Sequence, residues 1–284
     1  MGGEAAGTRA GGGREVARSL LAASHPEPAA VVTLAAGVLA LGAGRGWGTL
    51  LVLAAIGTGQ LAVGWSNDYL DRDADRAESR RDKPIAAGAV SAETVRNAAM
   101  AALLACIPLS LASGLGSAVA HFAALGCAIS YNAGLKNRPV SVLPFAAAFG
   151  LLPAIVALGL PAHRWPPGWA LLAGALIGSG GHFTQVLSDI PGDRRLGSRG
   201  LPQLLGQRAS ALLAALLLLA ATAVLTFAPG RPGLLPLAGM ALAVALTAAI
   251  LIAAAGGRMK LAFRLTLGVA AVAVVAFLAG GRSL

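Results

Sequence analysis

The sequence predicts an all-α integral membrane protein with nine transmembrane helices, and three observations support this fold class. First, 56% of the 284 residues are hydrophobic and only 12% are charged, whereas a soluble domain carries roughly a quarter charged residues. Second, apolar windows long enough to cross about 30 Å of hydrocarbon as a helix recur along the chain. Third, the basic residues are distributed unequally between the loops that join these windows.

The apolar windows are separated by polar segments or by breaks that contain Gly or Pro. Counting between these breaks gives nine expected spans: 28–44, 48–66, 92–112, 116–133, 141–160, 168–188, 209–228, 232–255 and 261–280. Residues 1–16 are expected to form a flexible tail, because their first part is rich in Gly and Ala and has no apolar core. Residues 17–284 are expected to form a single transmembrane domain.

The basic residues predict the orientation of these helices in the cell membrane. With the N-terminus inside, 18 of the 22 Lys and Arg residues fall on one side, and the other side receives Arg45, Arg164, Arg231 and Arg282. The positive-inside rule assigns the crowded side to the cytoplasm, so the C-terminus is expected outside. The net charge of +10 then serves orientation and attraction of anionic lipid or substrate, and no nucleic-acid partner is expected.

Acidic residues are concentrated at two points, and the first follows the second apolar span. Asp68, Asp71 and Asp75 share one face of a helix that turns by about 100° per residue, whereas Asp73 points elsewhere. Like charges at such spacings repel one another unless a cation compensates. Oxygen ligands without His or Cys favour Mg²⁺, which commonly bridges carboxylates to the phosphates of a substrate.

The second acidic point follows the sixth span and carries Asp189 and Asp193. Pro191 and Gly192 between them predict a break in the helix, with Asp193 on the following loop. Basic residues follow both acidic points, which suits a diphosphate substrate; they are Arg80, Arg81 and Lys83 in one case and Arg194, Arg195 and Arg199 in the other. The alternative is that both segments are merely solvated, charged loops.

The two acidic patterns together resemble the UbiA superfamily of intramembrane prenyltransferases. The patterns are Asn67-Asp68-x-x-Asp71-x-x-x-Asp75 and Asp189-x-x-x-Asp193, and the resemblance extends from about residue 17 to the end of the chain. Tyr131 and Lys136, in SYNAGLKNRP, look like a further element of this family. The resemblance implies a nine-helix bundle with a central apolar cavity, a Mg²⁺ cofactor and an allylic prenyl diphosphate substrate.

The resemblance also implies roles for individual residues. Metal binding would fall to Asn67, Asp68, Asp71, Asp75, Asp189 and Asp193. Catalysis would depend on Asp68, Asp71, Asp189, Lys136 and Tyr131, and contacts to the substrate would come from Asn67, Arg81, Lys136 and Arg138. His182 and Gln185 lie within about two turns of Asp189, so they either orient an acceptor or form a packed polar pair.

Other polar and small residues of the spans are expected to serve packing. Cys106 and Cys127 fall inside apolar spans, where free cysteine behaves as a small hydrophobic residue. His25, His121 and His163 have no partner at a useful sequence spacing and are expected to serve packing or to face solvent. The small residues of the sixth span should permit close helix contact or widen the cavity; they are Gly174, Gly178, Ser179, Gly180 and Gly181.

Three reactions or activities are compatible with this site. The expected one is transfer of the prenyl group to an aromatic, quinone-like or lipid acceptor, in a cavity that excludes water. The second is cyclisation of the prenyl chain on itself, against which a low aromatic content of 5% argues weakly. A cation or lipid transporter is the third, but transporters place charges near the bilayer midplane, and the aspartates here lie at helix ends.

Overall fold

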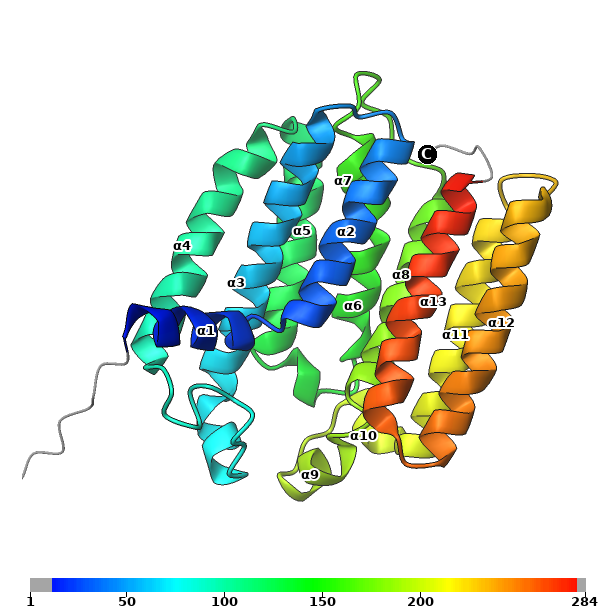
Figure 1. Ribbon diagram of the computed structural model, residues 1–284. Helices are drawn as coiled ribbons and strands as arrows, with labels where there is room; N and C mark the ends of the chain where they lie inside the picture. Colours follow the sequence, from blue (N-terminus) through cyan, green and yellow to red (C-terminus); the bar gives the residue numbers. More distant parts are fainter. Residues whose placement is uncertain (1–11, 280–284) are drawn as a thin grey trace, which may run out of the picture.

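The computed structural model describes residues 12–279, and all of its regular structure is helical. Long helices stand side by side as columns, with shorter helices and loops at their ends (Figure 1). The helices are α1 (Gly13–Ala23), α2 (Pro26–Gly42), α3 (Gly48–Ala77), α4 (Ala92–Leu111), α5 (Leu115–Asn132), the 3-10 turn η1 (Leu135–Asn137), α6 (Val142–Gly150), α7 (Leu152–Ala157), α8 (Gly168–Gln185), α9 (Ile190–Arg195), α10 (Leu201–Leu205), α11 (Gln207–Phe227), α12 (Leu234–Ala255) and α13 (Met259–Ala279).

Several of these helices have the length and hydropathy of membrane spans, as expected of a multi-pass membrane protein. By these criteria α3, α4, α11 and α12 qualify, and α1 with α2 forms a fifth candidate that is bent by 67°. Each of the nine windows expected from the sequence overlaps a helix of the described range 12–279, or the broken pair α6 and α7. Length and composition therefore support four or five spans, and the count of nine stays a prediction.

Two expected boundaries need correction. The N-terminal tail was expected to reach residue 16, but α1 begins at Gly13, and residues 1–11 lie outside the described part of the chain. The expected fifth span is broken into α6 and α7 between Gly150 and Leu152. Pro153 stands in the first turn of α7 and lacks the N–H that would bond to Phe149 one turn earlier, so a continuous helix would lose this bond.

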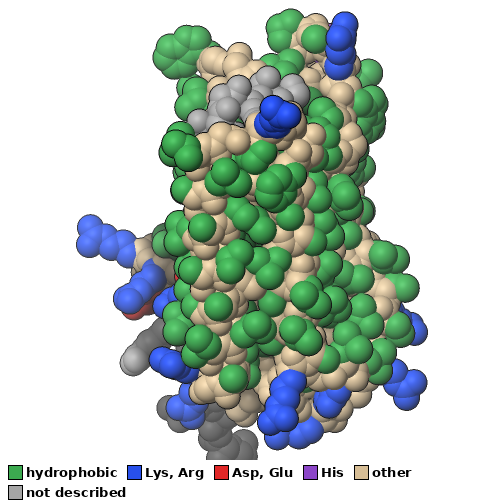
Figure 2. All heavy atoms as spheres, turned by 90° about the vertical axis from the view of Figure 1, so that its right-hand side faces the viewer, with side chains coloured by type: hydrophobic (Ala, Val, Ile, Leu, Met, Phe, Trp, Pro, Cys, Tyr) green, Lys and Arg blue, Asp and Glu red, His purple; other side chains and the backbone are tan. Residues whose placement is uncertain are grey.

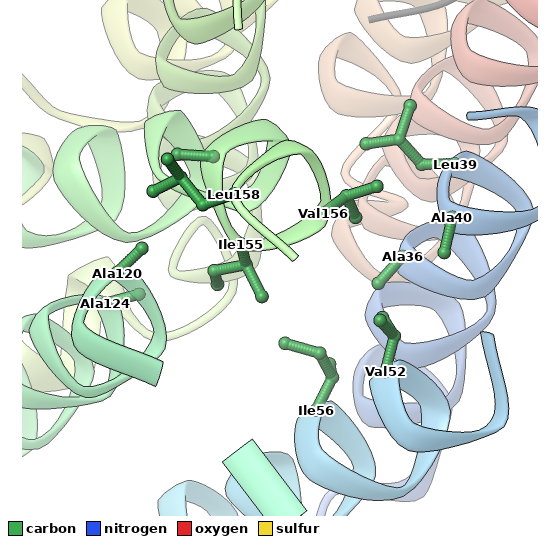
Figure 3. Close-up of a cluster of buried hydrophobic side chains, with 11 residues drawn as sticks. Ala36, Leu39, Ala40, Val52, Ile56, Ala120, Ala124, Ile155, Val156 and Leu158 are labelled. Atoms are coloured by element: carbon green, nitrogen blue, oxygen red, sulfur yellow. The ribbon is translucent and has the colours of Figure 1, made fainter. Parts of the chain in front are cut away.

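The buried core at the end of α3 opposite the aspartates joins α2, α3, α5 and α7. Figure 3 shows α7 between these helices, with Val156 toward α2 and Leu158 toward α5. Alanine is frequent in this cluster, as at Ala36, Ala40 and Ala120, and small side chains let helix backbones approach closely. A second cluster joins the segment after α8 to α11, α12 and α13.

The outer surface of the columns is apolar. Figure 2 shows the side formed by α11, α12 and α13, where hydrophobic side chains cover the middle and Lys and Arg gather toward the two ends. Large side chains such as Leu34, Leu104 and Leu216 are exposed there and on other faces. A continuous apolar surface of this kind is the sign of a lipid or protein interface. The end that carries more basic residues also carries α9, α10 and the loop after α3.

Candidate functional site

The first acidic segment lies on a long extension of α3. This helix runs for 30 residues, which is longer than an apolar span requires, and carries the aspartates on its last three turns. The side chain of Asp68 is 1% exposed and Asp75 is buried, whereas the side chain of Asp73 is 73% exposed and pairs with Arg72 and Arg76. Asp73 therefore points away from the face that carries Asp68, Asp71 and Asp75, as the helical spacing predicts.

Asp68 is held through one of its two carboxylate oxygens. Lys83 donates to Oδ1 of Asp68 at 2.7 Å, and Nε2 of His25 lies 3.3 Å from the same oxygen. The other oxygen, Oδ2, is buried and has no hydrogen-bond partner. The loop after α3 therefore returns Lys83 to the aspartates, and the turn before α2 brings a histidine that sequence spacing did not suggest.

Asn67 and Asp71 form the neighbouring part of the site with α5 and η1. The amide of Asn67 donates to Oδ2 of Asp71 at 2.9 Å, and Lys136 forms an ion pair with Oδ1 of Asp71. Asn132, at the end of α5, donates to the carbonyl of Val63 at 2.9 Å and thereby anchors α5 to α3. Asn67 and Lys136, which the family resemblance selected, thus meet at Asp71.

The second acidic segment follows the end of α8 at Gln185. Asp189 precedes α9, and the backbone N–H of Asp193 donates to the carbonyl of Asp189 at 2.9 Å, so the two aspartates occupy one helical turn. The helix breaks at residues 186–189, and not at Pro191 and Gly192 as predicted. The expected loop position of Asp193 is also wrong, because Pro191, Gly192 and Asp193 lie inside α9. Pro191 stands in the first turn of this helix, where its missing N–H has no intrahelical partner to lose.

Gln203 of α10 fixes Asp193. Its amide donates to Oδ2 of Asp193 at 2.6 Å, and its own Oε1 is buried without a partner. Burial raises the pKa of Asp193, and the nearby carboxylates of Asp189 and Glu78 raise it further, while the bonds from Gln203 and the charge of Lys136 lower it. A nearby cation would favour the charged form of this carboxylate.

The two acidic segments lie close together at one end of the bundle (Figure 1). Glu78, just after α3, reaches Gly192 of α9, where a Cβ would lie 3.0 Å from Oε1 of Glu78. Arg80 interacts electrostatically with Asp189 and Asp75, and both its bonds to Asp82, at 3.0 Å, raise its pKa. Basic side chains therefore lie between and beside the two acidic segments.

The remaining predicted phosphate contacts are differently placed. Arg81 and Arg138 are exposed, on the loop after α3 and at the end of η1. Lys83 pairs with Asp68 of the first acidic segment, and Arg80 pairs with Asp82 of the same loop. Of the three basic residues assigned to substrate contacts, Arg81, Lys136 and Arg138, Lys136 is the one that forms an ion pair with the first acidic segment.

An apolar cavity of about 130 Å³ lies beside Gln185 and is lined by residues of α2, α6, α7, α8, α11 and α13. Gln185 hydrogen-bonds to the buried Tyr131, which interacts electrostatically with Asp71, Asp189 and Asp193. His182 is buried, lies 3.1 Å from Oγ of Ser141 through Nε2, and packs against Tyr131. Gln185 thus joins the cavity to the acidic site, whereas His182 is in part a packed and hydrogen-bonded residue.

Comparison with known proteins identifies the family. A model of the UbiA prenyltransferase family matches residues 29–261. The chain belongs to the UbiA prenyltransferase family. Within it, digeranylgeranylglyceryl phosphate synthase of Pyrococcus furiosus is 28% identical over 174 residues, 60% of either chain. The protein of the same name from Methanothrix thermoacetophila is 32% identical over 178 residues, 55% of this chain and 58% of that protein. These matches span less than two thirds of the relatives' length.

Solved UbiA structures share the fold. A UbiA homologue from Archaeoglobus fulgidus bound to GPP and Mg²⁺ aligns with a TM-score of 0.69 at 18% identity, covering 93% of this chain and 98% of that one. The apo structure of a homologue from Aeropyrum pernix K1 aligns with a TM-score of 0.68 at 20% identity, with the same coverage. The family model confirms the expected UbiA family, whereas at these identities the solved structures show the fold alone.

The acidic site of this UbiA member fits a cation that completes its coordination with oxygens of water or phosphate. Between residues 12 and 279 there is no group of three His, Cys, Asp or Glu side chains close enough to hold a metal alone. Asp68 and Gln203, however, each present a buried oxygen without a partner. Mg²⁺ usually uses one or two carboxylates and takes further oxygens from water and substrate phosphates, and this incomplete oxygen set matches that preference.

The structure adds residues that the sequence reasoning missed. His25 was expected to serve packing or to face solvent, and instead it contacts Asp68. Glu78, Asn132 and Gln203 join the site as well. Sequence offered a signal for Gln203 and Asn132, which lie in the segments GLPQLLG and SYNAG of the resemblance, but none for His25, because its partners are more than 40 residues away.

Proposed function

We propose that this chain is a Mg²⁺-dependent prenyltransferase that ionises an allylic polyprenyl diphosphate and transfers the prenyl group to an aromatic, quinone-like or lipid acceptor. The observation that carries the proposal is that Lys83 and Lys136 pair with Asp68 and Asp71, while Lys136 also interacts electrostatically with Asp193 of the second segment. In the absence of a metal ion, these lysines neutralise the charge of the aspartates. When a diphosphate binds, the same lysines gain a second anionic partner. The membership in the UbiA family supports this reading.

Different residues of the site would serve metal binding, phosphate contact and exclusion of water. Asn67, Asp68, Asp71 and Asp75 on one side and Asp189 and Asp193 on the other would hold Mg²⁺ with the diphosphate. The chemistry supplied by bound Mg²⁺ is neutralisation of charge that develops on the leaving diphosphate. Lys136 lies between both acidic segments and is placed to contact phosphate oxygens. Tyr131 and Gln185 connect this end to the apolar cavity, where exclusion of water protects an allylic cation.

We further propose the membrane arrangement that the basic residues predict. All nine apolar segments cross the membrane, the acidic end faces the cytoplasm, and the N- and C-termini lie inside and outside. Residues 17–284 then form one transmembrane domain around a central cavity. The apolar exterior and the concentration of basic residues near the acidic end support this arrangement.

A lipid is the first acceptor to test. The curated relatives are named digeranylgeranylglyceryl phosphate synthase, so an isoprenoid glyceryl phosphate belongs in the acceptor panel beside aromatic and quinone-like compounds. The cavity is lined almost wholly by apolar side chains, such as Phe149, Leu152 and Ile177. Such a lining suits an aliphatic chain better than a polar acceptor.

Cyclisation of the prenyl chain is a second candidate, and an aromatic cluster favours it. Phe145 and Phe149 line the cavity with ring centroids 6.2 Å apart, and Tyr131 meets Phe145 edge-on at 4.8 Å. Aromatic faces stabilise cations, so this cluster could guide a migrating carbocation. Incubation with geranyl, farnesyl and geranylgeranyl diphosphates and Mg²⁺ alone separates the two reactions. A cyclic hydrocarbon or alcohol identifies a cyclase; diphosphates that persist until an acceptor is added identify a transferase.

The proposal is tested by removing one aspartate from each acidic segment. Asp68→Ala and Asp193→Ala should each abolish diphosphate turnover in detergent-purified protein with Mg²⁺. The matched control is Asp73→Ala, which removes an exposed aspartate of the same helix and should retain activity. Full activity of Asp68→Ala or Asp193→Ala in correctly inserted protein would rule out the proposed two-segment site.

A further inference from the structure

The turn between α1 and α2, formed by Ser24 and His25, touches the acidic site directly. The two helices meet here at an angle of 67°. His25 precedes α2 in the left-handed conformation, with φ 52°, and its side chain makes no capping bond to that helix. The ring is therefore free of the usual role of a polar residue at this position and points toward α3 instead.

His25 contacts both members of the ion pair between Asp68 of α3 and Lys83 of the following loop. Its Nε2 lies 3.3 Å from Oδ1 of Asp68 and 3.1 Å from Nζ of Lys83, while Lys83 itself donates to the same Oδ1 at 2.7 Å. The side chain of His25 is 39% exposed, but that of Asp68 is 1% exposed. Protein contacts thus converge on one oxygen of Asp68 and leave Oδ2 buried without a partner.

Gly64 makes this approach possible. It lies one helical turn before Asp68, and a Cβ at Gly64 would come within 2.7 Å of the Ser24 carbonyl carbon and 2.9 Å of its Cα. No side chain fits there without displacing the turn. The adjacent Trp65 fixes α1 as well, because its indole N–H donates to the carbonyl of Leu20 at 2.8 Å. The chain just before His25 is therefore seated on α3 at two points, Leu20 and Ser24.

We infer that His25 is a positioning residue, which together with Lys83 fixes Oδ1 of Asp68 so that Oδ2 is presented to the divalent cation. This inference rests on the proposed Mg²⁺-dependent function and adds the N-terminal turn to the site. A ligating carboxylate needs its second oxygen held if its geometry is to be constant, and loss of such outer contacts typically weakens metal binding about 10- to 100-fold. The N-terminal helix α1 then supports the site by holding this turn in place.

The test measures binding of Mn²⁺, which also prefers carboxylate oxygens, by the EPR signal of the free ion in the absence of substrate. His25→Gly keeps the left-handed turn without steric cost and removes only the ring, so the dissociation constant for Mn²⁺ should rise about 10-fold or more. His25→Gln returns a side-chain nitrogen and should recover part of the affinity. The control is His163→Gly, another left-handed histidine, with φ 46°, in the loop before α8.

The Mg²⁺ concentration needed for half-maximal turnover should rise in parallel for His25→Gly and stay unchanged for His163→Gly. Gly64→Ala, which displaces the turn, should act in the same direction, and His25→Gly decides the outcome if Gly64→Ala does not fold. Equal Mn²⁺ affinity and Mg²⁺ requirement in wild type and His25→Gly would overturn the inference and leave the proposed function standing. A wild-type protein that neither binds Mn²⁺ nor turns over prenyl diphosphate would overturn both.

Discussion

At the scale of single residues, the site pairs each central aspartate with a basic side chain from another element. Asp68 pairs with Lys83 of the loop after α3, and Asp71 pairs with Lys136 of η1. An ion pair with 1% and 13% exposure at Asp68 and Lys83 loses most of its hydration, which is tolerated when both groups keep good partners. The lysines are therefore as much a part of the site as the aspartates.

Lys136 should govern affinity for the diphosphate. Lys136→Met removes the charge between the two acidic segments, and hydrogen bonds to charged groups contribute roughly 1.5–3 kcal/mol. We expect the KM for prenyl diphosphate to rise about 10-fold or more, since 1.4 kcal/mol corresponds to about a factor of ten. Steady-state kinetics with varied diphosphate at saturating Mg²⁺ measure this effect.

Arg138→Met is the comparison for this experiment, because Arg138 is two residues away and exposed. The resemblance assigned both residues to the phosphate, whereas the structure places only Lys136 against Asp71. A large effect at Arg138 with no effect at Lys136 would contradict the geometry of the site.

At the scale of elements, a few buried contacts hold the short helices of the site to the long ones. Ser141, just before α6, is fully buried; its Oγ accepts from the backbone N–H of Leu201 at 3.0 Å and lies 3.1 Å from Nε2 of His182. One hydroxyl thus joins α6, α8 and α10. Because α10 carries Gln203, this contact also positions the partner of Asp193.

Ser141→Ala should destabilise this junction. It leaves the N–H of Leu201 and the ring of His182 unpaired in the interior, and an unsatisfied buried polar group costs about 1–3 kcal/mol of the free energy of unfolding. The midpoint of thermal unfolding in detergent should fall by several degrees. Ser130→Ala is the matched control, since the Oγ of Ser130 bonds only to Cys127 of its own helix; an equal loss in both variants would deny the junction a special role.

The small residues of α8 divide into two groups. A Cβ at Gly178 would lie 2.6 Å from the carbonyl oxygen of Phe145, so Gly178 allows α6 and α8 to touch, whereas Gly181 has no neighbour within 4 Å and lines the cavity. Gly178→Ala should therefore lower stability by about 1–3 kcal/mol through overpacking. Gly181→Ala should unfold at the wild-type temperature. Differential scanning fluorimetry of the two variants tests this contrast, and equal stability would show that the helices can separate without cost.

At the scale of the whole molecule, both acidic segments gather at the basic end of the bundle. The loop before α8 carries Arg164 at one end, and α9 carries the exposed Arg195 at the other. The proposed topology places these residues on opposite sides of the membrane.

Single cysteines test this topology. In a background in which Cys106 and Cys127 are replaced by alanine, Arg164→Cys should react with a membrane-impermeant maleimide on intact cells. Arg195→Cys should react only after permeabilisation. The reverse pattern would invert the orientation. Labelling of both positions from outside would contradict the single membrane crossing, by α8, that the proposed topology places between Arg164 and Arg195.

The sequence by itself determined the class of fold, the two acidic segments and the family. Composition and apolar windows need no tertiary contact, because a lipid solvent acts on each helix separately. The shared face of Asp68, Asp71 and Asp75 follows from the period of one helix, which is local geometry. The family follows from the same residues, since their spacing is itself the pattern that relatives share.

Only the tertiary structure decided which residues from distant segments meet these aspartates. His25 reaches Asp68 because Gly64 lets a turn approach α3, and Gln203 reaches Asp193 because Ser141 docks α10. Asp193 lies in a helix rather than a loop because Pro191 occupies a first turn, a choice that depends on where α8 ends. Such pairings are set by the packing of elements far apart in sequence, and no local period encodes them.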